Sequence, residues 1–218
     1  MKIQEIRTFG RRHGKRLSAR KTELLDNLLP AISPKNIEKA GKSFILEIGF
    51  GNGEHVRELA NQYPDDIIIG AEPFMNGVAA LLSAMTNESD NTVFPEYKNI
   101  RIWGDDVRKI LNDDSNDFVD IKFGQIWVLH PDPWPKARHE KRRLLNSEFL
   151  NLLSSRLTDN GQIIIGTDHH EYYDWIVDGL SETNLKIDTT DLDIIKTRYM
   201  QKNKAGTDAP KYLVLSNK

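Results

Sequence analysis

The sequence contains no cysteine. This absence excludes disulfides, thiolate catalysis, zinc ribbons and iron–sulfur ligation, and it is typical of proteins of the reducing cytosol. The sequence also lacks any run of about 18 apolar residues, and no apolar stretch follows the basic start Met1-Lys2. We therefore expect a cytoplasmic protein with no membrane-spanning segment and no secretory leader. The histidines form no HExxH pair, so no metal site is expected.

A strong excess of one charge is lacking too, because the formal net charge is -2. That balance argues against a uniformly basic nucleic-acid binder. The charges are segregated, however: residues 1–21 carry eight lysines and arginines against the single acid Glu5, and residues 136–143 carry five against Glu140. Such a chain can present one basic face to an RNA backbone. The alternative is that both runs are solvated surface, or that residues 1–21 form a disordered arm.

Short apolar runs alternate with amphipathic stretches from residue 44 onward. We expect strands at 44–48, 67–71, 100–103, 125–129 and 162–166, and helices near 54–63, 74–86, 106–112, 143–157 and 170–183. This alternation predicts an α/β fold with a mostly parallel sheet and helices on both faces. Two more runs, at 186–190 and 211–216, make seven strands, and the irregular linker between them predicts an antiparallel last strand. A polar loop is expected at 86–98.

The length of 218 residues suits one domain. We expect it over residues 41–218, after a basic arm and a leading helix at 1–40.

Glycines at alternate positions follow the first expected strand. Gly49, Gly51 and Gly53 let the backbone turn sharply and approach a ligand, so they predict a nucleotide-binding loop. Glu72, at the end of the second strand, stands where α/β nucleotide folds hold ribose hydroxyls. Glu47 adds negative charge where a dinucleotide would place its pyrophosphate, so a cofactor with sulfonium and ammonium groups suits the loop better than NAD. The alternative is a tight strand–helix turn that binds nothing.

Two acids, Asp105 and Asp106, follow the third expected strand. Asp106 is our candidate to accept a hydrogen bond from the adenine amino group of a cofactor. Capping of the next helix is the alternative role for either acid.

A stiff loop follows the fourth expected strand. Its prolines at 131, 133 and 135 fix φ three times in five residues. Asp132 lies between two of them, Trp134 offers a flat face to a base, and the basic run that follows can bind phosphates. The alternative is a proline-rich loop with a core tryptophan and a solvated basic helix start.

The run PDPWPKxRHxKRR, together with LEIGFGNGE, GAEPF, GTDHHEYYDW and TRYMQK, resembles the bacterial tRNA (guanine-N7-)-methyltransferases over residues 44–216. The resemblance implies a Rossmann-like class I methyltransferase fold with S-adenosyl-L-methionine as cofactor and tRNA as partner. It also implies methyl transfer to N7 of a guanine at variable-loop position 46.

Site residues carry over position by position. The resemblance implies that Asp132 is catalytic and that the cofactor is contacted by Glu47, Glu72, Asp106 and Asp132. From the glycine loop itself, we also expect cofactor contacts at Gly49, Gly51 and Gly53. It implies substrate contacts from Lys136, Asp168, Thr197, Arg198 and Tyr199, and RNA contacts from Arg138, His139, Lys141, Arg142 and Arg143. The chain departs from the family pattern at His130, where many members have phenylalanine, and at Met200, where many have glutamate.

Guanine N7 has a free lone pair and no proton at neutral pH, so methyl transfer to it needs no strong general base. Positioning should dominate, and Asp132 is expected to act electrostatically. Asp168 could accept the guanine N1–H and amine, or could cap a helix that starts near His169. Two further functions stay open: methylation of an exocyclic amino group of RNA, and RNA binding without catalysis.

Overall fold

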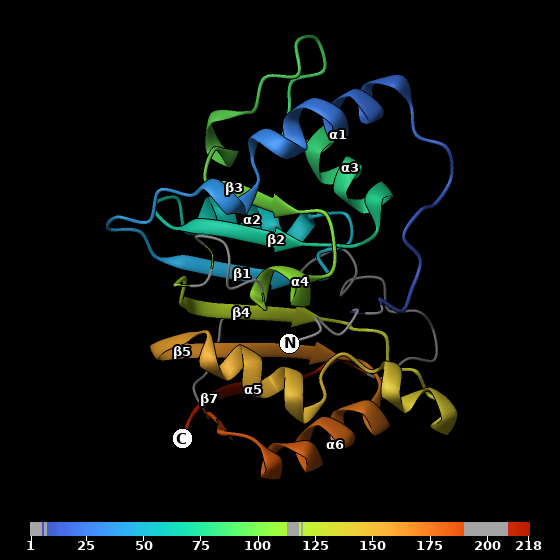
Figure 1. Ribbon diagram of the computed structural model, residues 1–218, viewed down its shortest axis with the longest axis vertical. Helices are drawn as coiled ribbons and strands as arrows, with labels where there is room; N and C mark the ends of the chain where they lie inside the picture. Colours follow the sequence, from blue (N-terminus) through green and yellow to red (C-terminus); the bar gives the residue numbers. More distant parts are fainter. Residues whose placement is uncertain (1–5, 7, 113–117, 119, 190–208) are drawn as a thin grey trace. The chain divides into compact units, whose positions relative to one another are not determined.

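The structure is a computed structural model that describes residues 6, 8–112, 118, 120–189 and 209–218. Seven strands pair in the order β3-β2-β1-β4-β5-β7-β6 (Figure 1). Their bounds are β1 Phe44–Ile48, β2 Ile67–Ala71, β3 Ile100–Trp103, β4 Phe123–Leu129, β5 Leu157–Thr167, β6 Leu185–Ile187 and β7 Lys211–Asn217. Strand β7 runs antiparallel to both of its neighbours. The expected α/β fold with an antiparallel last strand is therefore confirmed.

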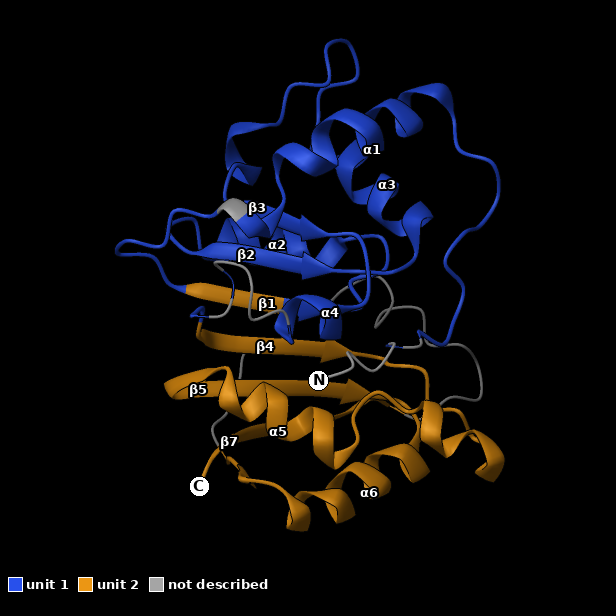
Figure 2. Ribbon diagram, in the orientation of Figure 1, with its two compact units in different colours: residues 1–43, 47–121 blue, residues 44–46, 122–218 orange. Residues whose placement is uncertain are grey.

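The chain forms two compact units, coloured separately in Figure 2. The first comprises residues 1–43 and 47–121, and the second comprises residues 44–46 and 122–218. The boundary that we expected between residues 40 and 41 stays a prediction.

The first unit holds β2 and β3, which pair in parallel with Ile68 opposite Ile100. Every residue of β2 is buried, which explains why its sequence is a continuous apolar run. The helices of this unit are α1 Ala19–Ala31, α2 Glu54–Gln62, α3 Met75–Ala84 and α4 Val107–Leu111, with the 3-10 turns η1 Pro34–Asn36 and η2 Pro95–Tyr97. Helix α1 packs against α3 (Figure 1). The Ser18 side chain caps α1 by accepting a hydrogen bond from the Lys21 amide.

The second unit holds β4, β5, β7 and β6, with Gln125 of β4 opposite Gln162 of β5. Its helical elements are η3 Ala137–Arg142, α5 Ser147–Ser155, α6 His170–Gly179 and η4 Leu180–Glu182. Two expectations need correction here. Strand β5 begins five residues earlier than expected, because Leu157 pairs with Phe123 of β4 before the register shifts and the ladder resumes at Gln162 opposite Gln125. The helix expected near 143–157 begins only at residue 147, where Asn146 caps it by accepting a hydrogen bond from the Phe149 amide.

None of the described helices is long and apolar enough to cross a membrane. Over the same described ranges, no cluster of three histidine, aspartate or glutamate side chains forms a potential metal site.

Candidate functional site

The glycine loop joins β1 to α2 in left-handed backbone. Gly49, Gly51 and Gly53 have φ values of 77°, 58° and 73°, a region that L side chains rarely adopt. A Cβ added to Gly49 or Gly51 would meet nothing within 4 Å, whereas one added to Gly53 would lie 2.6 Å from the Leu81 side chain. Gly49 and Gly51 therefore leave open space beside the loop backbone, and Gly53 lets α2 start close to α3.

Glu72 is held in one orientation at the end of β2. The residue is 7% exposed, with Oε2 accepting from the Gly51 amide at 2.8 Å and Oε1 accepting from the Phe74 amide at 2.8 Å. Glu72 is therefore a buried carboxylate held in one orientation, a group of the kind that accepts hydrogen bonds from ribose hydroxyls.

Glu47 is paired with a histidine that the sequence analysis missed. His55, the second residue of α2, lies with its Nδ1 3.0 Å from Glu47 Oε2, and both side chains are buried. The available signal was a histidine in the first turn of the helix that follows the glycine loop. Because His55 engages Oε2, it restricts the rotation of the Glu47 carboxylate.

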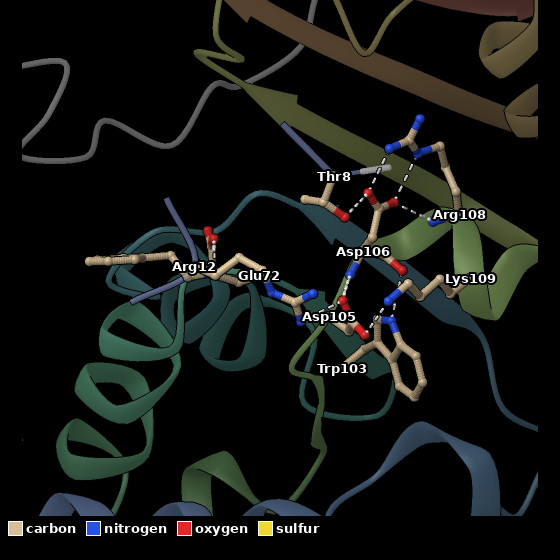
Figure 3. Close-up of polar contacts among 9 residues, drawn as sticks. Thr8, Arg12, Glu72, Trp103, Asp105, Asp106, Arg108 and Lys109 are labelled. Atoms are coloured by element: carbon tan, nitrogen blue, oxygen red, sulfur yellow. Dashed lines mark hydrogen bonds and ion pairs between the residues drawn. The ribbon is translucent and has the colours of Figure 1, made fainter. Parts of the chain in front are cut away.

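Asp106 caps α4 (Figure 3), so the helix-capping alternative is confirmed for this residue. Its Oδ1 accepts from the Arg108 amide and Nε, and its Oδ2 accepts from Arg108 Nη2 at 2.7 Å and Thr8 Oγ1 at 2.8 Å. Burial by itself would raise the pKa of Asp106, but hydrogen bonds from Arg108 and Thr8 and the charge of Arg108 hold that pKa below its ordinary value. Asp106 is therefore held firmly in one orientation, with both carboxylate oxygens engaged by Arg108 and Thr8.

The loop that follows β4 and contains prolines 131, 133 and 135, here called the proline loop, has unusual backbone at two residues. His130 has φ 51° and Trp134 has φ 43°, and such values in bulky residues are strained. The His130 amide donates to the Gly166 carbonyl at 2.7 Å, and its Nδ1 lies 3.9 Å from Asp168 Oδ1. Burial lowers the pKa of His130, although Asp168 opposes that shift. Asp132 lies exposed inside this strained segment.

Trp134 packs against two residues of η3. The Arg142 guanidinium lies 5.0 Å from the centre of its ring, and His139 meets that ring edge-on at 5.8 Å. Burial, and then the charges of Arg142, Arg138 and Lys136, lower the pKa of His139. The indole is half-buried and belongs to the surface of the loop, which differs from the core position that we considered.

Arg143 points inward, in contrast to the expected RNA contact. It is 5% exposed, donates from Nε to the Pro133 carbonyl at 2.9 Å, and lies 5.5 Å and 5.0 Å from the ring centres of Tyr172 and Trp175. Its guanidinium therefore holds the proline loop through the Pro133 carbonyl and is too buried to contact a phosphate. Lys136, Arg138 and Lys141 of the same run are exposed.

Helix α6 is capped by His169, whose side chain accepts a hydrogen bond from the Tyr172 amide. The alternative role that we gave Asp168, capping this helix, is therefore wrong. Asp168 stays half-exposed near His130, and its proposed contact with guanine stays a prediction. Thr197, Arg198 and Tyr199, as well as Met200, lie outside the described residues.

The comparisons with known proteins agree with this pattern of elements and motifs. A family model described as "Putative methyltransferase" matches residues 41–208. A tRNA (guanine-N(7)-)-methyltransferase of Neorickettsia sennetsu is 34% identical, covering 92% of this chain and 87% of its own. The chain belongs to this methyltransferase family. A Wolbachia pipientis protein of the same name is 38% identical, over 82% of this chain and 76% of its own.

Among solved structures, the aminoglycoside resistance methyltransferase NpmB1 matches with a TM-score of 0.54 and 12% identity. The match covers 91% of this chain and 93% of that one. At this identity the likeness extends to the fold alone.

A second residue that the sequence analysis missed is Gly77 of α3. A Cβ at this position would lie 2.2 Å from the Gly51 carbonyl oxygen, so only glycine lets α3 approach the glycine loop this closely. A lone glycine inside a helical pattern was the available signal.

Proposed function

We propose that this chain methylates tRNA, transferring a methyl group from S-adenosyl-L-methionine to N7 of the guanine at variable-loop position 46. The observation that carries the proposal is family membership: the Neorickettsia relative bears the name of this activity and aligns with 92% of the chain. A tRNA substrate also implies a cytoplasmic location.

The residues of the first unit fit the proposed cofactor. Open space beside Gly49 and Gly51 would admit a ligand close to the backbone, Glu72 would hold the ribose hydroxyls, and Glu47 would attract the ammonium group. A carboxylate at the Glu72 position repels a 2′-phosphate, which disfavours NADP. When bound, S-adenosyl-L-methionine supplies an electrophilic methyl group on its sulfonium.

Asp132 is the proposed catalytic residue, and its role is electrostatic. Guanine N7 attacks through a lone pair, so no proton has to be removed, and positive charge moves onto the guanine ring as the methyl group transfers. A preorganised carboxylate stabilises that charge. The strained φ of His130 and Trp134, two residues before and after Asp132, is consistent with a loop built to position one group.

Phosphate binding is assigned to the exposed cations Lys136, Arg138 and Lys141, with His139 and Arg142 beside Trp134. Each phosphate neutralised on double-stranded nucleic acid changes the slope of log affinity against log salt by about 0.9. We expect tRNA affinity to fall steeply between low and physiological salt, and neutralising any one of the three exposed cations should make the slope shallower by about 1. An affinity that does not respond to salt would contradict this assignment.

The test is incubation with an unmodified tRNA transcript and labelled cofactor, followed by identification of the methylated nucleoside. N7-methylguanine makes the strand sensitive to reduction and alkaline cleavage, whereas a methylated exocyclic amine does not, so the product separates our proposal from amine methylation. A transcript with adenine at position 46 should accept no methyl group. tRNA binding without any transfer would indicate a non-catalytic relative.

The variant Asp132→Asn tests the catalytic assignment. It removes the negative charge and keeps the size, so kcat should fall by about 10²–10³. Asp159→Asn is the matched control, because Asp159 is an exposed carboxylate in the polar first half of β5. Equal activity of both variants would remove Asp132 from the mechanism.

A further inference from the structure

The N-terminal arm, the segment that precedes α1, is held against α3 by its backbone. The Arg12 carbonyl accepts from the Met75 amide at 2.9 Å. Because α3 has no side-chain cap of its own, this bond satisfies one of the unpaired amides at its start. Asn76 accepts from the Gly14 amide and donates to the Lys15 carbonyl, both at 2.7 Å. The arm backbone between residues 12 and 15 is therefore fixed on the surface of the first unit.

Two arginines of the basic N-terminal run are paired within the same unit. Arg12 Nη2 lies 2.9 Å from Asp105 Oδ1 (Figure 3). The Arg20 guanidinium, in the first turn of α1, donates to the Ser83 hydroxyl at 2.7 Å and to the Thr86 hydroxyl at 2.9 Å. These two cations therefore tie the arm and α1 to the rest of the unit.

Three other cations of the run have no such partner. Arg11, Lys15 and Arg16 are exposed, and none of them forms an ion pair or a side-chain hydrogen bond with another described residue. Like charges this close together repel one another, so the fold gains nothing from them. The backbone bonds at residues 12, 14 and 15 fix the points from which these side chains leave the surface. We call the three residues the cationic track.

A pocket of about 760 Å³ lies beside two residues of the cationic track. Lys15 and Arg16 line it from the arm, and the exposed acids Glu23 and Asp26 line it from α1. The cations attract a phosphate, whereas the carboxylates repel one and accept hydrogen bonds from hydroxyls or amines. A ligand that suits both walls carries an anion on one side and hydroxyl or amino donors on the other. A ribonucleotide within an RNA chain has this pattern, because it presents a phosphate and a 2′-hydroxyl.

We propose that the N-terminal arm is a tRNA-binding surface, in which the cationic track binds the phosphate backbone and the pocket beside α1 receives one ribonucleotide. The inference rests on the proposed function, because it takes tRNA as the substrate, and it adds a contact in the first unit to the basic run of the second. An arm that is already fixed loses little conformational entropy on binding, whereas a disordered basic tail would have to be ordered by the RNA. The track therefore contributes affinity for tRNA and leaves cofactor binding unchanged.

The experiment measures binding of an unmodified tRNA transcript over a range of salt concentrations. One phosphate contact on a duplex changes the slope of log affinity against log salt by about 0.9, which amounts to about fivefold in affinity between about 1 M and about 0.15 M salt. Lys15→Ala and Arg16→Ala should each weaken binding by about that factor and make the slope shallower by about 0.9. Lys98→Ala is the matched control, because Lys98 is an exposed lysine outside the arm, and it should bind as the wild type does. Affinity for S-adenosylhomocysteine, measured without RNA, should be the same in all of these proteins.

The variant Asn76→Ala tests whether the arm is fixed in advance. It removes the bonds to Gly14 and Lys15 without removing a charge. tRNA binding should weaken about threefold to tenfold, because the arm must then be ordered by the RNA. Affinity for S-adenosylhomocysteine should stay at the wild-type value.

The double variant Glu23→Ala/Asp26→Ala tests the pocket. It removes the acceptors for a ribose hydroxyl, so it should narrow the preference for the transcript over a DNA strand of the same sequence. The ratio of the two affinities is the readout, because the lost negative charges act equally on the phosphates of both strands.

The outcomes separate this inference from the proposed function. If the wild-type protein neither binds nor methylates the transcript, the proposed function fails. If the wild type methylates it and both Lys15→Ala and Arg16→Ala bind tRNA as Lys98→Ala does, the cationic track is solvated surface and the inference is wrong. An effect of these two variants without any effect of Asn76→Ala would overturn the fixed arm in favour of an unstructured charged tail. An unchanged preference for RNA in the double variant would exclude a ribonucleotide from the pocket.

Discussion

Arg143 gives the sharpest prediction about the proline loop. Replacing it with methionine keeps much of the side-chain length and removes the Nε bond to the Pro133 carbonyl and the stacking on Tyr172 and Trp175. A hydrogen bond from a charged donor contributes about 1.5–3 kcal/mol, and a desolvated cation–π contact contributes about 2 kcal/mol. Methionine recovers part of this because it buries no charge. We therefore expect Arg143→Met to lower the free energy of unfolding by about 2–3 kcal/mol.

Arg143→Met should disturb the proline loop more than the rest of the fold. Pro133 directly follows Asp132, so a released Pro133 carbonyl frees the Asp132 carboxylate, the proposed catalytic group, to move. We expect kcat to fall at least tenfold while cofactor affinity stays near its wild-type value. Urea unfolding at pH 7 and steady-state methylation of tRNA measure the two effects.

Lys141→Met is the matched control, because it makes the same kind of change two residues away on an exposed side chain. It should leave the free energy of unfolding unchanged, raise KM for tRNA and make the salt dependence of binding shallower. If Arg143→Met behaves like Lys141→Met, with unchanged stability and a shallower salt slope, then Arg143 binds RNA and our interpretation of its burial is wrong.

Three further predictions concern other buried contacts. His55→Phe should raise KM for the cofactor about tenfold with little change in kcat, because it frees the Glu47 carboxylate. His55→Gln should restore part of the affinity, and a KM of His55→Phe equal to that of the wild type would contradict the role of this pair. Burial raises the pKa of Tyr172 to about 12, from an ordinary value near 10, so the folded state should lose about 2.7 kcal/mol in all as pH rises from well below 10 to well above 12, of which about 2 kcal/mol falls between pH 10 and 12. Urea unfolding across that range should show this loss in the wild type and a smaller one in Tyr172→Phe. Arg20 donates to Asn91, Ser83, Thr86 and Asn87, so Arg20→Ala should lower thermal stability without weakening tRNA binding, whereas the exposed Arg16→Ala should leave stability unchanged.

Strands β1, β2 and β3 could be predicted to the residue because all or half of their residues are buried, and burial leaves an uninterrupted or alternating apolar pattern. The first half of β5 escaped prediction for the opposite reason. Residues 158–160 are exposed, so their polar sequence resembles a loop, and they lie where the register between β4 and β5 shifts, between the pair Leu157–Phe123 and the pair Gln162–Gln125. The late start of α5 depends on a single cap at Asn146, a residue type that is equally common in turns.

Charge runs were the least informative part of the sequence, because a run does not reveal which cations are already paired. In residues 136–143 one arginine is buried under the proline loop, while three other cations are exposed. In the N-terminal run, Arg20 donates to Ser83 near the end of α3 and to Thr86 just after it, and Arg12 donates to Asp105. These partners are distant in sequence, so no local pattern could identify them.

Methyl transfer to N7 needs no proton abstraction, so residues that hold acceptors in place should matter as much as the acceptors themselves. Each unit contains an arginine that holds part of a loop in place. Arg12 donates to Asp105 in the turn that carries Asp106, and Arg143 donates to the carbonyl next to Asp132. The two should differ in what they control. Arg12 contacts the turn that carries Asp106, for which the family resemblance implies a cofactor contact, so we expect loss of Arg12 to appear in the dissociation constant of the cofactor. Loss of Arg143 acts on a group proposed to meet charge only as the methyl group moves, so it should appear in kcat. A variant lacking both arginines should show the two effects multiplied, since each arginine and its carboxylate lie within a separate compact unit; a combined loss far from the product would mean that the two turns are coupled.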